Sequence, residues 1–176
     1  MARSITDRML GALRLQQDVY EEVEADEKAT GEAAFIIVAT SLVSGAVNGV
    51  LTGVSSGFFG ALGSFLGWAF YAWVAYIVGV KLFPGPQTKS SWGELARTLG
   101  YANTARFLII FELVPGFAAL TRTVVGLWVL VATVVALRSA LDITTGRAIW
   151  IAIASAIGQL IIIAVALTVA VAFFPR

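Results

Sequence analysis

Long apolar runs with almost no charge constrain this chain more than any other feature of its sequence. Three of them, residues 33–54, 58–83 and 148–174, are uncharged apart from Lys81. Each exceeds the about 20 apolar residues that an α-helix needs to cross the hydrocarbon core of a bilayer. Residues 1–32 hold 12 of the 23 formal charges, so the other 144 residues carry too few to cover a soluble surface. We therefore predict an all-α, polytopic transmembrane helical bundle.

The stretch between residues 102 and 137 is apolar but interrupted by Glu112, Pro115-Gly116 and Arg122. Because proline cannot donate the helical hydrogen bond, Pro115 predicts a turn between two short spans, residues 102–114 and 123–137. The chain would then have about five spans. The alternative is a re-entrant hairpin, in which the two segments enter the membrane and leave it on the same side without crossing it.

Lysine and arginine are distributed unequally between the two sides of a five-span protein. One side would hold the N-terminal tail, the 81–106 loop and the 138–147 loop, with ten basic residues, whereas the other would hold only Arg122 and Arg176. Positively charged loops stay in the cytosol. We therefore predict a cytosolic N-terminus and a C-terminus outside.

Residues 1–32 form a charged segment before the transmembrane domain of residues 33–176. Ile5, Met9, Leu10 and Leu13 recur near helical spacing, which predicts short amphipathic helices. The second helix is acidic and carries Glu21, Glu22, Glu24 and Asp26. These carboxylates would face a basic protein partner, or they would form a solvated helix face folded over the bundle.

Small residues recur along the first two spans. Ser41, Gly45, Gly49, Gly53 and Gly57 follow one another at every fourth position, and Gly60, Ser64 and Gly67 continue the theme. In lipid, small residues let helix backbones approach closely. The face they form would pack the first span on the second within one molecule, or it would join two copies in a homo-oligomer.

Glu112 is the one carboxylate inside a predicted span. Charge at membrane depth is unfavourable by about 3 kcal/mol, so such residues usually have a role. Glu112 could form an ion pair with Arg122 across the Pro115-Gly116 turn. It could instead be the protonatable or cation-binding site of a small transporter, with Asn48, Asn103 and Gln159 as polar neighbours.

The residue types exclude several function classes. The chain has no histidine and no cysteine, which removes the usual zinc and haem ligands and the common general bases and thiol nucleophiles. We predict no cofactor, no metal and no catalytic constellation. The net charge of +1 gives no support for a nucleic-acid partner.

A helix start is predicted at Ser91, because Ser91 and Glu94 have the spacing of a capping box. The helix would place Trp92, Leu95 and Leu99 on one side. That arrangement predicts a helix lying in the membrane interface.

Several blocks together resemble the Yip-type (Ypt-interacting protein) membrane domain family. They are Trp92-Gly93-Glu94-Leu95, the run from Gly100 to Thr104 (Gly-Tyr-Ala-Asn-Thr), Pro115-Gly116, Val125-Gly126-Leu127-Trp128, and the run from Ala136 to Ala148. The opening Tyr20-Glu21-Glu22-Val23-Glu24 resembles the prokaryotic members. The residues that carry the resemblance most specifically are Gly100, Tyr101, Ala102, Asn103, Thr104, Pro115, Gly116, Leu141, Asp142, Gly146 and Arg147.

The resemblance implies five spans, a cytosolic N-terminus and, for a prokaryotic member, the inner membrane. The family often has proline where this chain has Ala105, so the third span would begin less abruptly. Eukaryotic relatives are linked to Rab-type GTPases, but the short tail of this chain gives no ground for that partner.

Taken together, the sequence favours a non-enzymatic integral membrane protein. It would be a scaffolding, accessory or membrane-organising subunit whose partners are the bilayer and other membrane proteins of a larger complex. The alternatives are a small transporter or channel that uses Glu112, and a docking site for a GTPase-like partner on the acidic tail.

Overall fold

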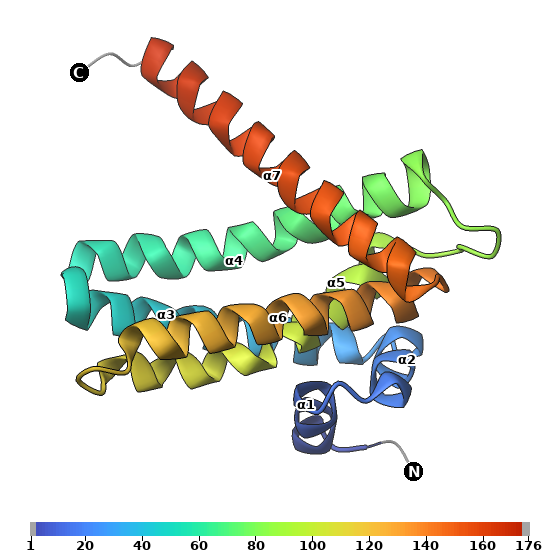
Figure 1. The fold of residues 1–176 in the computed structure, drawn as a ribbon, viewed down its shortest axis with the longest axis horizontal. Helices are drawn as coiled ribbons and strands as arrows, with labels where there is room; N and C mark the ends of the chain where they lie inside the picture. Colours follow the sequence, from blue (N-terminus) through green and yellow to red (C-terminus); the bar gives the residue numbers. More distant parts are fainter. Residues whose placement is uncertain (1–2, 174–176) are drawn as a thin grey trace.

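A computed structural model describes residues 3–173, and the side chains of residues 3–165. This part of the chain is helical throughout, apart from short connections (Figure 1). The elements in chain order are α1 (Ile5–Leu13), α2 (Gln17–Ala25), α3 (Ala29–Thr52), α4 (Val54–Tyr76), the π-helix η1 (Ile77–Leu82), α5 (Trp92–Ala102), the 3₁₀ helix η2 (Asn103–Leu113), α6 (Ala118–Leu141) and α7 (Thr145–Phe173). The all-α bundle predicted from the sequence is confirmed.

Four helices in the described part of the chain are long and apolar enough to cross a membrane: Ala29–Thr52, Val54–Leu82, Ala118–Leu141 and Thr145–Val165. They correspond to four of the five expected spans, with shifted ends. The first begins before residue 33 and includes Glu32, and the helix expected over 123–137 has 24 residues instead of being short. The predicted end of the last span, Phe174, lies outside the described residues.

The segment expected as the third span, residues 102–114, takes a different form. It is an 11-residue 3₁₀ helix, η2, that continues directly from α5. At helical rises of about 1.5 Å and 2.0 Å per residue, α5 and η2 extend over about 16 Å and 22 Å. The two together are therefore long enough for a fifth pass, although half of that pass is not α-helical.

The ends of the passes alternate in the way a five-pass bundle requires. The α3–α4 turn and the turn after η2 lie at the same end of the long axis of the molecule (Figure 1). The connections between η1 and α5 and between α6 and α7 lie at the other end. This arrangement favours the two-span interpretation of residues 102–137 over the hairpin.

Helix α5 lies at the centre of the bundle, in contact with α1, α2, α3, α4 and α6. The capping box that begins it is present, since Glu94 N donates to Ser91 Oγ and Ser91 N donates to the Glu94 side chain. Every residue from Leu95 to Ala102 is buried. The apolar face expected to meet the membrane interface therefore meets other helices at Leu95 and Leu99, whereas Trp92 is exposed, because apolar periodicity does not distinguish a face that meets lipid from one that meets protein.

The N-terminal segment folds as two short helices against the bundle, as predicted. Arg14 and Leu15 reverse the chain between them, with Leu15 in the left-handed region at a φ of 60°. Both helices contact α5; α2 also packs on α6, and Trp128 Nε1 of α6 donates to Leu13 O at 2.9 Å. Residues 3–25 are thus part of the packed structure and not a free tail.

Candidate functional site

The 3₁₀ helix η2 aligns three of its four polar residues in one row. Side chains three positions apart eclipse one another in a 3₁₀ helix, so Asn103, Arg106, Ile109 and Glu112 lie above one another. In the second half of η2 burial follows this row: Ile109 is half-buried and Glu112 is buried, whereas their neighbours on both sides are exposed. In an α-helix Glu112 would lie about 120° around the axis from Arg106. The 3₁₀ conformation therefore keeps the polar groups of this pass on the side facing the bundle.

Glu112, at the end of this row, forms an ion pair with Arg122 of α6. Arg122 Nη2 donates to Glu112 Oε2 at 2.7 Å, and Arg122 Nε donates to Glu112 Oε1 at 3.2 Å. The carboxylate is 1% exposed and the arginine side chain 66% exposed. The four-residue turn with Gly116 at a φ of 82° returns the chain so that these two residues meet. Of the two roles considered for Glu112, this geometry is that of the ion pair.

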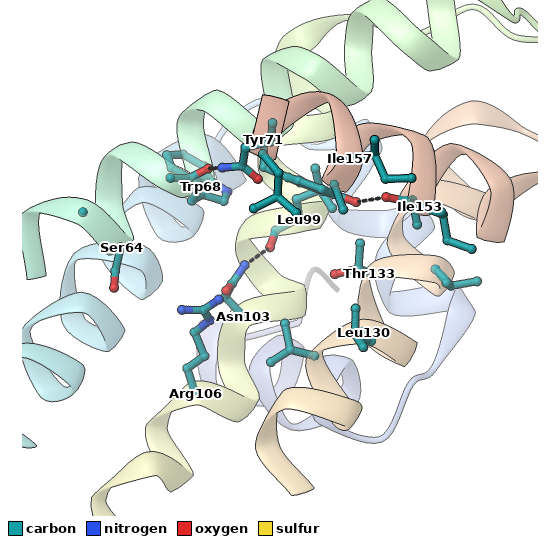
Figure 2. A pocket seen from close by; sticks show the side chains of 18 of the residues that line it. Ser64, Trp68, Tyr71, Leu99, Asn103, Arg106, Leu130, Thr133, Ile153 and Ile157 are labelled. Carbon is teal, nitrogen blue, oxygen red and sulfur yellow. Dashed lines mark hydrogen bonds between the residues drawn. The ribbon is translucent and has the colours of Figure 1, made fainter. Parts of the chain in front are cut away.

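Arg106, in the middle of the row, faces a cavity between α4, the α5–η2 pass, α6 and α7. The cavity has a volume of about 850 Å³ and mostly apolar walls (Figure 2). Its polar lining comes from Asn48, Ser64, Tyr71, Asn103, Thr133 and Gln159. Figure 2 shows the Arg106 guanidinium beside Asn103. Among the side chains that the structure describes, none forms a hydrogen bond or an ion pair with Arg106.

The polar residues expected around Glu112 therefore line the cavity that Arg106 faces. Asn48, Asn103 and Gln159 do line one cavity together, but Glu112 is not among its lining residues. The sequence interpretation missed Arg106 because it assigned that residue to the 81–106 loop. The available signal was the spacing of the polar residues: three positions from Asn103 to Arg106 and six from Arg106 to Glu112. This spacing places them in one row only if the segment is a 3₁₀ helix.

The small residues of α3 and α4 form a tight seam within one molecule. A Cβ added to Gly57 would lie 2.6 Å from Gly45 O and 2.9 Å from Gly49 Cα. Gly57 belongs to α4 and not to the first span, because the chain turns at Gly53, where φ is 109°. The every-fourth pattern thus crosses the turn and places glycines on both sides of the seam. Gly60 and Gly67 contact Asn48 and Gln159 instead, and Ser64 lines the cavity.

The acidic residues of α2 are largely engaged inside the molecule. Arg8, which is 2% exposed, donates to Glu22, Asp26 and Glu32 at 2.7 to 3.0 Å. Burial lowers the pKa of Arg8, but the three hydrogen bonds outweigh it and hold that pKa above its ordinary value. Glu32 also accepts a hydrogen bond from the Tyr101 hydroxyl. Of the four carboxylates expected to face a partner, Glu22 and Asp26 are therefore paired with arginine.

Glu24 lies in a less favourable environment than its neighbours. Burial, followed by the negative charges of Asp142 and Glu94, raises its pKa to about 7. Arg97 is close but binds the backbone, since its Nη2 donates to Glu24 O at 2.5 Å and its Nε donates to Val23 O. The remaining member of the expected set, Glu21, is exposed and accepts from Gln17 Nε2 at 2.8 Å.

The block from Gly100 to Thr104, which carries part of the family resemblance, holds α5 against its neighbours. A Cβ on Gly100 would lie 2.8 Å from Ala33 Cβ, so glycine allows close contact with α3. Tyr101 reaches Glu32, and Ala102 is buried. Asn103 Nδ2 donates to Leu99 O and Thr104 Oγ1 to Tyr101 O. These residues have contacts that stabilise the fold at the junction of α5 and η2.

The second block shapes the connections on either side of α6. Pro115 and Gly116 form the turn that precedes the helix, and Asp142, at a φ of 50°, ends it. Leu141 O accepts from Thr88 Oγ1 at 2.7 Å. Arg147 Nη2 donates to Phe83 O and Pro84 O, which holds the start of α7 on the chain after η1. Gly146 has open space where a side chain would lie.

Comparison with known proteins supports the resemblance seen in the sequence. The family model described as the Yip1 domain matches residues 11–167, which covers all the described helices except the first six residues of α1 and the last six of α7. The curated proteins and the solved structures give no significant match. Its apolar passes and its match over most of the length place this chain in a membrane, as a member of the Yip1 domain family.

Proposed function

We propose that this protein is a non-enzymatic, integral membrane module that binds a transmembrane helix of another membrane protein through α7. The observation that carries the proposal is the position of α7, which diverges from the other helices along its length (Figure 1). All side chains from Leu160 to Val165 are exposed, so this part of the helix is uncovered around its whole circumference. A helix that spans a membrane can bury such a surface against lipid or against a partner helix.

The chemistry of α7 indicates what kind of partner would fit. Residues 148–173 carry no charged side chain, and the exposed residues include Leu160, Ile161 and Val165. A partner segment would therefore be an apolar transmembrane helix, held by dispersion contacts. The charged groups at the other end of the molecule are mostly satisfied internally, which supports a role in assembly more than one in reaction chemistry. The Yip1 domain family is not a family of enzymes.

Site-specific photo-crosslinking in the native membrane tests this proposal. A photoreactive amino acid at Ile161 on α7 should give a defined crosslinked product with another membrane protein. The same amino acid at Val38, an exposed residue of α3, is the matched control and should give mainly lipid adducts. A crosslink to a second copy would identify the partner as this chain itself. Crosslinks to lipid alone from both positions, with only free monomer after mild-detergent extraction, would contradict the proposal.

The topology that we propose has the N-terminus in the cytosol and the C-terminus outside, in the inner membrane of a prokaryote. The end of the molecule that carries α1, α2 and the 83–91 connection is rich in Lys and Arg, whereas the turn after η2 is followed by Arg122 alone. Arg106 is no longer counted among the basic residues of the cytosolic side, because it lies inside a helical pass. Arg176 lies outside the described residues. The remaining asymmetry still favours this orientation. Labelling of a cysteine placed at Gly116 by an impermeant reagent in intact cells, and of one at Lys89 only after lysis, would support it.

Transport through Glu112 and GTPase docking on the acidic tail receive less support. Glu112 is engaged by Arg122, so Glu112→Gln should lower stability without a flux phenotype in proteoliposomes. Glu22 and Asp26 are engaged by Arg8, which leaves Glu21 as the most exposed carboxylate of the expected set. Flux lost in folded Glu112→Gln would restore the first alternative, and salt-sensitive binding that requires residues 1–28 would restore the second.

A further inference from the structure

The cavity beside η2 combines an unpaired cation with apolar walls. Its apolar lining includes Val129, Leu130, Ile153, Ile157 and Leu160. A charge left without a partner in such surroundings is strongly unfavourable. The other arginine of this region, Arg122, is bound by Glu112, so that carboxylate is already engaged. Arg106 therefore lacks the counter-charge that its position calls for.

Several other donors that line the cavity are already engaged, since Asn103, Tyr71 and Gln159 donate to backbone carbonyls. Trp68 also lines the cavity, and its indole Nε1 is buried without a hydrogen-bond acceptor among the described residues. Ser64 contributes a further hydroxyl donor to the lining. No carboxylate is among the lining residues that the structure describes. A cavity with an unpaired guanidinium and no acidic group favours an anion.

The shape of the cavity adds a second requirement. It is half-open, and its rim is formed on the side of α7 by Ile157 and Leu160, which are 53% and 67% exposed. In a bilayer these side chains would border acyl chains. A ligand that enters here would approach from the membrane, with its hydrocarbon part between α4 and α7.

We propose that this cavity binds an anionic amphiphile. Its oxyanion head, the phosphate of a phospholipid or the carboxylate of a fatty acid, would pair with Arg106, and its chain would lie against the apolar wall. The planar guanidinium suits both oxyanions, because each offers two oxygens to its parallel N–H donors. This site shares Leu160 with the partner surface proposed for α7, but ligand retention and helix crosslinking are measured separately, so either proposal can fail alone.

One variant tests the binding of the anionic head group, and a second tests the space for the hydrocarbon chain. Arg106→Met removes the charge and leaves a side chain of similar length. Gly63→Leu fills the cavity from α4, where a Cβ at Gly63 would meet nothing within 4 Å. Each has a matched control outside the cavity. Arg14→Met removes an exposed arginine of the N-terminal segment, and Gly126→Leu adds the same side chain at an equally open glycine of α6.

The measurement is native mass spectrometry of the full chain released from phosphatidylcholine nanodiscs that contain either palmitate or phosphatidylglycerol. The wild type should retain one of these two probes, and which one it retains identifies the head group. Arg106→Met and Gly63→Leu should each retain about tenfold less, while Arg14→Met and Gly126→Leu retain as much as the wild type. The thermal stability of Arg106→Met should not fall, because the arginine it removes has no partner.

The proposal would be overturned if the wild type retained neither probe. It would also be overturned if folded Arg106→Met retained the same amount as the wild type, because the guanidinium would then have no part in binding. A Gly63→Leu variant that retains the full amount would place the retained molecule elsewhere on the protein.

Discussion

Helices α3 and α7 are both long, apolar and almost free of charge, yet the first is firmly packed and the second is largely open. In the most apolar 18-residue stretch of each helix, 39% of the residues are buried in α3 and 22% in α7. The hydropathy of α7 is the higher of the two. Apolar character therefore does not decide which helix is packed, because lipid is as apolar as another helix.

What distinguishes α3 is that it is held at two points. Toward one end, Gly45 and Gly49 fit against Gly57 of α4. At the other end, Glu32 binds Arg8 and Tyr101. Helix α7 is fixed at its start by Arg147, and further along Tyr71 donates to Ala152 O and Gln159 donates to Gly67 O. Small residues and satisfied charges, and not hydrophobicity, set how closely each helix is held.

The largest effect is expected at the glycine seam. Gly57→Val would place a branched side chain where even a Cβ lies 2.6 Å from a backbone oxygen of α3. Backbone cannot move aside as a side chain can, so the two helices would have to separate. We expect a loss of about 3 kcal/mol or more in the free energy of unfolding, or no folded protein at all. Thermal unfolding in detergent, followed by circular dichroism, measures it.

Gly126→Val is the matched control, since a Cβ at Gly126 meets nothing within 4 Å. It should change stability little. Equal destabilisation by both variants would show that the loss comes from replacing a helical glycine by valine and not from the close contact between α3 and α4.

The second anchor of α3 is tested by Arg8→Met. This change leaves Glu22, Asp26 and Glu32 without their shared cation. The three carboxylates are 25 to 30% exposed, so water compensates in part. We expect a loss of about 2 kcal/mol and earlier proteolysis of the N-terminal helices. Arg14→Met, which removes an exposed arginine, should leave both properties unchanged.

A pH dependence of stability is expected from Glu24 of α2, whose pKa is raised to about 7 mainly by burial. A carboxyl group whose pKa is raised on folding stabilises the protein fully below its unfolded pKa of 4.5 and loses that contribution as pH rises through about 7. Glu24→Gln removes the titrating carboxyl group and therefore this loss of stability at higher pH. The variant should match the wild type near about pH 4 and exceed its stability by about 1 kcal/mol near about pH 8, a figure reduced for partial solvent exposure.

Thermal unfolding at both pH values checks this prediction, with Glu27→Gln as an exposed control on the same segment. A stability gain in Glu24→Gln that does not vary with pH would mean that the Glu24 carboxyl does not titrate with the fold.

The sequence predicted those parts of the structure that depend on local pattern. Apolar length identified the long helices, the capping box identified the start of α5, and the spacing of small residues identified the seam. Glu112 and Arg122 could be paired in advance because they flank a single short turn. Each of these predictions needed only residues close in sequence.

The features that were missed depend on distant residues or on an unusual backbone. Arg8 meets Glu32, 24 positions away, only after α1 and α2 fold back on α3. Arg106 was assigned to a loop because nothing in its neighbours predicts a 3₁₀ helix of 11 residues. The central position of α5 was missed because its apolar face suits lipid and protein equally well. The candidate site was therefore less predictable than the fold.

The smallest expected effect concerns the weak attachment of α7. Gln159 Nε2 donates to Gly67 O of α4 at 3.0 Å, and Gln159→Leu removes this bond without removing apolar contact. A single hydrogen bond between membrane helices contributes about 0.6 kcal/mol, so global stability should barely change. The distance between α4 and α7 should respond more clearly. The chain has no cysteine, so spin labels can be placed at Leu66 and Ile161 and their separation measured by pulsed electron resonance.

We expect a broader distance distribution between these labels in Gln159→Leu than in the parent chain. A second pair of labels at Val38 on α3 and Leu62 on α4 is the internal control, and its distribution should stay unchanged because the glycine seam holds those helices. If both distributions broaden, the polar bond organises the whole bundle. If neither does, α7 is held by its apolar contacts and by Arg147, and the contrast between α3 and α7 is smaller than their burial indicates.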